Sequence, residues 1–114
     1  MKIDIPFSRM SVTLPVGFES GGQHYDTAEV RAVTGADELY IGMSREYNQN
    51  PNDMIYKMLL LGRCVTRLGE ENIVTLSDVQ QLHARDIRAL ERAVYSLTYG
   101  PGAVPDGEDD SPGG

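Results

Sequence analysis

The chain has 114 residues and a formal net charge of −7. This length fits one domain with a core of its own, and the acidic balance argues against nucleic acid as a partner, because phosphate binding needs clustered Lys and Arg. The single cysteine, Cys64, excludes an intramolecular disulfide and a cysteine-cluster metal site.

The apolar runs of the sequence are short. The longest, MLLL at positions 58–61, is far below the roughly 20 residues that a membrane-spanning helix needs. The first ten residues, MKIDIPFSRM, lack the apolar core of a signal peptide. We therefore expect a soluble, intracellular protein that does not bind membranes.

Residues 1–33 have the pattern of a β-hairpin. The runs RMSVTLPV and HYDTAEVRAV carry β-branched residues in partial alternation, and ESGGQ between them supplies a Gly-Gly turn. Pro15 lies in the first run and lacks a backbone N–H, so we expect a bulge or an early strand end there. A lone hairpin is marginally stable in water, so it must pack on the helices that follow.

Residues 34–100 are expected to be helical. Thr34 is a suitable N-cap residue, and Asp37 three positions later completes a capping-box pattern. The first helix should fade in REYNQNPND, and the next should open at Pro51. Apolar residues at spacings of three and four then predict a helix face that runs to a C-terminal glycine, Gly69. They are Met54, Ile55, Met58, Leu61, Cys64, Val65 and Leu68.

Two further helices should close the domain. Ser77 is placed to cap a short helix that follows an extended piece, and the last helix covers ARDIRALERAVYSL. The apolar stripe of the last helix consists of Ile87, Leu90, Val94 and Leu97, and Gly100 and Pro101 stop it. The predicted fold class is α+β, with one domain over residues 1–100 in which an N-terminal β-hairpin packs on a bundle of three to four helices.

The C-terminal segment differs in composition from the rest. The last 15 residues, GPGAVPDGEDDSPGG, hold four acids and no base, which leaves a net charge of −3 on the remainder. Five Gly and three Pro give this segment little to bury, so we expect residues 101–114 to be a disordered acidic tail. It is either a solubilising end or an electrostatic shield or tether for a basic partner, and the sequence does not choose.

Residues with catalytic or metal-binding chemistry are few and scattered. Asp37 and Glu38 are adjacent and do not face each other on a helix, and both sit in a first turn that favours negative charge, so a capping role is expected. His24 and His83 are 59 positions apart with no ligand spacing around either. Cys64 lies on an apolar helix face and is expected in the core. We predict no catalytic, cofactor-binding or metal-binding residues.

Three arginines of the last helix could form a docking face. Arg85, Arg88 and Arg92 recur at spacings of three and four, with Asp86 and Glu91 between them. An ordinary solvated helix face is the favoured interpretation, and docking onto an acidic partner is the alternative.

Three stretches, taken in order, carry a family resemblance. They are VTLPVGFESGGQHYDTAEVRAVTGADE, LLLGRCVTRLGEE and VTLSDVQQLHARDIRALERAVYSLTYG. Together they resemble the small tail-assembly proteins of contractile phages and phage-like particles, a group described as T-even-like baseplate hub assembly chaperones. The resemblance spans about residues 12–100. The acidic Gly/Pro tail departs from those relatives that end in a cysteine-containing segment, so no metal role of that segment carries over.

The resemblance implies a non-enzymatic assembly factor that acts in the host cytoplasm. Such a protein would bind a phage tail or baseplate protein, such as the tape measure or a hub protein, before assembly, and it would need no cofactor. Adaptable side chains left exposed would make the contact. The candidates in this sequence are Tyr40, Met43, Tyr47, Met54 and Met58.

Three alternatives remain open on the sequence. The protein could be a structural baseplate component that is retained in the particle. It could be a small enzyme or metal protein that uses His24 and His83. It could also be an acidic host-directed inhibitor that mimics DNA, although the acids concentrate in the tail and are not spread over the domain.

Overall fold

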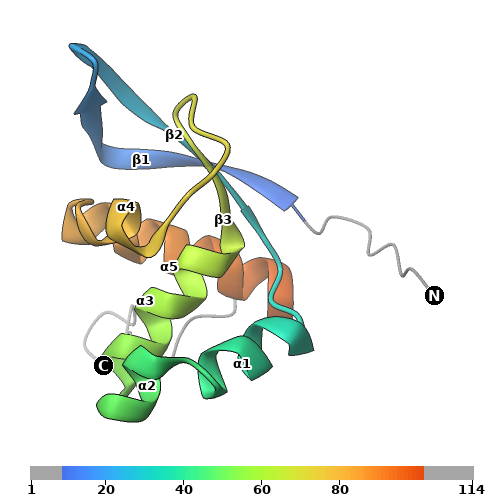
Figure 1. Ribbon diagram of the computed structural model, residues 1–114. Helices are drawn as coiled ribbons and strands as arrows, with labels where there is room; N and C mark the ends of the chain where they lie inside the picture. Colours follow the sequence, from blue (N-terminus) through green and yellow to red (C-terminus); the bar gives the residue numbers. More distant parts are fainter. Residues whose placement is uncertain (1–8, 102–114) are drawn as a thin grey trace, which may run out of the picture.

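A computed structural model describes residues 9–101, and its fold class is the predicted α+β (Figure 1). Apart from Pro101, the expected acidic tail lies outside the described residues. None of the described helices is long and apolar enough to cross a membrane. The elements in chain order are β1 (Arg9–Ser20), β2 (Gln23–Arg31), α1 (Gly35–Gly42), α2 (Arg45–Gln49), α3 (Asp53–Cys64), β3 (Val65–Leu68), α4 (Leu76–Gln80) and α5 (Ala84–Tyr99).

The predicted hairpin forms, and it has an irregularity near Pro15. β1 and β2 pair antiparallel around Gly21 and Gly22, whose positive φ angles of 58° and 80° suit a tight two-residue turn. The pairing register shifts between Thr13 and Phe18, and the strand then continues to Ser20. Of the two outcomes expected at the proline, the bulge is therefore the one that occurs.

A third strand corrects the predicted helical region. The helix expected to run to Gly69 ends at Cys64, and β3 follows and pairs antiparallel with β2 in a sheet of order β1-β2-β3. Val65 and Thr66 are both β-branched. Val65 pairs with β2, and the Thr66 hydroxyl donates to Glu29 of β2 at 2.8 Å. These tertiary contacts outweigh the helical spacing of the apolar residues. Gly69 therefore follows a strand. Its φ of +58° and the closeness of the Tyr25 ring leave no room for a side chain.

The helix boundaries need three smaller corrections. The segment expected to be a loop contains α2, because the Ser44 hydroxyl accepts the Tyr47 N–H at 3.2 Å and starts a turn. The next helix begins at Asp53 with Asn52 as N-cap, so Pro51 lies before it. The cap of α4 is Thr75, and the expected cap residue Ser77 lies inside that helix.

One face of the sheet and the apolar sides of α3 and α5 enclose the core (Figure 1). The expected alternation holds, since Ala28 and Val30 of β2 and Ala32 just after it are buried. Cys64 is also buried, as predicted. The fully buried apolar side chains of the helices include Ile41, Leu61, Val79, Leu90 and Val94. α1 and α2 lie at the opposite end of the molecule from the hairpin turn.

Candidate functional site

The first turn of α1 is organised around the buried carboxylate of Asp37. Thr34 is the N-cap residue, as predicted, and its N–H donates to Asp37 Oδ2 at 2.8 Å. Arg31 donates from two nitrogens to the two oxygens of Asp37, at 2.8 and 2.7 Å, and Arg63 donates from Nε to Oδ1 at 3.1 Å. The carboxylate therefore joins β2, α1 and α3, which is more than the helix cap expected from the sequence.

Burial and pairing act in opposite directions on this carboxylate. Burial alone would raise the pKa of Asp37, but hydrogen bonds from the two arginines and the Thr34 amide outweigh it and hold that pKa well below its usual range. Asp37 is thus an anion at neutral pH. Burial raises the pKa of the neighbouring Cys64 thiol to about 11, although Arg31 opposes this in part, so Cys64 remains a protonated core residue.

The outer face of α1 exposes large apolar side chains. Leu39, Tyr40 and Met43 are 65%, 52% and 74% exposed, and together they form what we call the α1 surface. Met43 lies one turn from both other residues, so the three share one side of the helix, opposite the buried Asp37 and Ile41. The sequence predicted Tyr40 and Met43 as partner-binding residues and missed Leu39, although its i, i+4 spacing to Met43 could have identified it.

Arg63 borders the α1 surface and is held from two sides. Its guanidinium carbon lies 4.4 Å from the centre of the Tyr40 ring, while Nε is bound by Asp37. Its side chain remains 35% exposed. Arg63 and Arg45 line a shallow cavity of about 490 Å³ together with the α1 surface, Ala36, Ser44 and Glu46. An apolar contact area and a fixed cation therefore lie side by side.

The other predicted apolar contact residues are dispersed. Met54 is 52% exposed at the start of α3. Tyr47 and Met58 are half-buried and pack against the core, and the Tyr47 ring makes an edge contact with Tyr56 at 6.2 Å between centroids. Tyr47 and Met58 therefore contribute more to the fold than to an exposed surface.

The three arginines of α5 differ in their surroundings. Arg85 and Arg92 are exposed, whereas Arg88 is partly buried and binds Glu91 at 2.6 Å. Arg88 is therefore engaged inside its own helix, which suits the favoured interpretation of an ordinary helix face.

A buried acid of α5 that the sequence did not single out fastens the hairpin. The carboxylate of Asp86 is fully buried and accepts the N–H groups of Val16 and Gly17, each at 2.8 Å. Gly17 has φ +83°, and a Cβ there would lie 2.6 Å from the Tyr25 carbonyl oxygen. These contacts fix the β1 bulge on the first turn of α5. No local signal predicts them, because the partners are about 70 positions apart.

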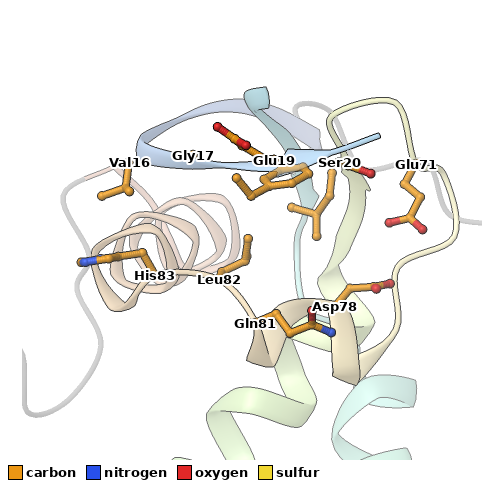
Figure 2. Close-up of a pocket in the computed structure, with 11 residues that line it drawn as sticks. Val16, Gly17, Glu19, Ser20, Glu71, Asp78, Gln81, Leu82 and His83 are labelled. Atoms are coloured by element: carbon orange, nitrogen blue, oxygen red, sulfur yellow. The ribbon is translucent and has the colours of Figure 1, made fainter. Parts of the chain in front are cut away.

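A second concavity lies between the hairpin and the α4–α5 connection (Figure 2). Phe18, Leu68 and Leu82 contribute apolar wall, and its volume is about 560 Å³. The carboxylate of Asp78 lies on its rim but already accepts the Thr75 N–H at 2.9 Å. Glu19 points away from the cavity and Glu71 lies on the loop that borders it. This lining has no pattern that points to a particular ligand.

The two histidines occupy separate places in the fold. His24 is exposed on the hairpin, and His83 caps α5, where its Nδ1 accepts the Arg85 N–H at 3.1 Å. Within residues 9–101, no three His, Cys, Asp or Glu side chains gather in a way that could hold a metal ion.

Comparisons of the chain with models of known protein families, with curated proteins and with solved structures found no match. The functional conclusion therefore depends on the sequence resemblance and on the geometry of the α1 surface.

Proposed function

We propose that this protein is a non-enzymatic assembly factor for a contractile phage tail or baseplate. It binds a tail component, such as the tape measure or a hub protein, in the host cytoplasm before assembly. The resemblance of the sequence suggests the class of client. The observation that carries the binding role is the exposed α1 surface, on which three large apolar side chains lie together outside the core.

The chemistry of this surface suits a client that is not yet in its final conformation. Met43 is flexible and polarisable, so it can adapt to differently shaped apolar partners. Tyr40 and Arg63 are of the residue types that contribute most at protein interfaces, and here they are already fixed against each other. Binding therefore requires little ordering of these two side chains.

Charge reversal on the α1 surface tests this proposal. The tagged full chain is co-expressed with each tail protein encoded beside it, as wild type and as Leu39→Glu/Met43→Glu. We expect at least a tenfold loss of retained client for the variant. Its free energy of unfolding should change by no more than about 0.5 kcal/mol, because both positions are exposed. Retention is measured by quantitative mass spectrometry.

Ile73→Glu is the matched control. Ile73 is 82% exposed on the loop between β3 and α4, so this change adds one negative charge, against two in the α1 variant, at an exposed apolar position elsewhere. It should leave retention unchanged. Equal losses from both variants, or no retained tail protein with the wild type, would count against a client site on α1.

The abundance of the protein in purified particles separates an assembly factor from a structural component. An assembly factor should be absent or far below one copy per baseplate position, whereas a structural component should be stoichiometric. Deletion of residues 101–114 tests the alternative that the protein is an acidic host-directed inhibitor. Client retention should survive this deletion, whereas an inhibitory activity of the acidic C-terminal segment should be lost.

A further inference from the structure

The charge balance around Asp37 leaves one guanidinium only partly used. Asp37 is a single anion bound by two arginines, Arg31 and Arg63. Arg31 engages it with two nitrogens, whereas Arg63 uses only Nε. Among the described residues, Asp37 is the one acidic partner in a salt bridge with Arg63. The two terminal nitrogens of Arg63 therefore remain available at the edge of the α1 surface.

Arg63 is also preorganised for binding. The Asp37 contact fixes the inner edge of the guanidinium, and the Tyr40 ring lies against its face at 4.4 Å. A guanidinium held in this way loses little side-chain freedom when it binds a carboxylate through two parallel N–H donors. Arg45 adds a second positive charge to the lining of the same cavity, and Glu46 adds one negative charge, so the rim has a positive excess.

We infer that the α1 surface recognises a continuous segment of its client that carries a carboxylate beside a large apolar side chain. The apolar side chain packs on Leu39 and Met43, and the Asp or Glu binds the terminal nitrogens of Arg63. This inference rests on the proposed function and adds the chemistry of the partner. Charge complementarity with Arg63 and Arg45 favours this occupant over a neutral or basic segment.

The net charge of the protein opposes the binding of acidic segments. At −7, the chain as a whole repels acidic peptides and attracts basic ones. A preference for acidic segments must therefore come from local contacts, and long-range attraction cannot imitate it. The effect of salt distinguishes the two further, because screening weakens the overall repulsion.

The test uses an array of overlapping 15-residue peptides, with the full chain as the probe. The peptides span the tail proteins that are encoded beside this protein. We expect the bound peptides to contain Asp or Glu within four residues of Leu, Ile, Met or Phe. Replacing that acid by Asn or Gln should weaken binding at least tenfold, as measured by fluorescence anisotropy. Leu39→Glu/Met43→Glu should abolish binding of the same peptides.

Variants of the protein complete the test. Arg63→Lys keeps the charge but removes the paired donors, and it should weaken binding about tenfold, with folding checked by urea denaturation because Arg63 also binds Asp37. Arg45→Gln should weaken binding a few-fold. Arg85→Gln removes the same charge from an exposed site on α5 and should have no effect.

Several outcomes would overturn the inference. The protein could bind neutral or basic peptides, or bind none of the peptides. Replacement of the acid in a bound peptide could also leave its affinity unchanged. If one of these outcomes occurs while Leu39→Glu/Met43→Glu still retains less full-length client than the wild type, the proposed function stands and the inference fails. Binding that appears only after deletion of residues 101–114 would assign the surface to the acidic tail of the chain, and self-association that depends on Arg63 would assign it to a second copy. Either result also contradicts the inference.

Discussion

Asp37→Asn is expected to destabilise the protein by about 3 kcal/mol, which is the lower end for breaking a buried ion pair. The lower end applies because Asp37 itself is fully buried while Arg31 and Arg63 keep 26% and 35% of their side-chain exposure. The amide cannot neutralise either guanidinium, and it cannot accept hydrogen bonds through both of its terminal atoms. Urea denaturation measures the change, and the melting temperature should fall by roughly 15 °C.

Glu38→Gln is the control for this prediction. Glu38 is the next residue in the same first turn but is exposed, so it shares the interaction with the helix dipole and lacks the arginine contacts. Its loss should cost at most about 0.5 kcal/mol. Similar effects of the two substitutions would mean that Asp37 acts only as a helix cap.

The pH dependence of stability provides a second measurement on the same variant. The folded pKa of Asp37 is lowered, so the unfolded state takes up a proton first as the solution becomes more acidic. The stabilisation that Asp37 provides is complete above the unfolded pKa of about 3.9. It is lost as pH falls below that value toward the lower folded pKa. Between about pH 4 and pH 2 the wild type should therefore lose stability more steeply than Asp37→Asn.

Local patterns were sufficient to predict the hairpin and the closing helix. The Gly-Gly turn is set by positive φ angles that favour glycine, and the alternation along β2 depends on which face of one strand is buried. The long apolar stripe of α5 was equally readable, because its period of 3.6 is maintained over 16 residues. In each case the determinant lies within a few positions of the residue concerned.

β3 could not be predicted because its determinant is remote in sequence. Leu61, Cys64, Val65 and Leu68 keep helical spacing, so the apolar pattern continues smoothly from α3 into the strand. The change to an extended conformation depends on pairing with β2, where Val65 lies opposite Val30. A pairing across 35 positions leaves no trace in the local period.

The α1 site was predicted in part for the same reason. Thr34 and Asp37 are three positions apart, so their capping relation was visible in the sequence. The contact between Asp37 and Arg63 spans 26 positions and depends on how α3 crosses α1. The sequence therefore indicated the helix cap, whereas the charge cluster and the fixed guanidinium required the fold.

The contact between Asp86 and the bulge leads to the second large stability prediction. Asp86→Ala removes both acceptors of the Val16 and Gly17 N–H groups and leaves these donors facing the first turn of α5. Hydrogen bonds to a charged acceptor contribute about 1.5–3 kcal/mol each, and the two share one carboxylate, so we expect a loss of about 3 kcal/mol by urea denaturation.

Asp53→Ala is the matched control, since Asp53 is an exposed acid in the first turn of α3 and should contribute no more than about 1 kcal/mol. The hairpin is held to α5 by the Asp86 contacts and to β3 through β2, so amide exchange along residues 16–20 should increase more in Asp86→Ala than exchange in β3. Uniform exchange throughout the sheet would contradict a local role for Asp86 and would make the carboxylate a general requirement for folding.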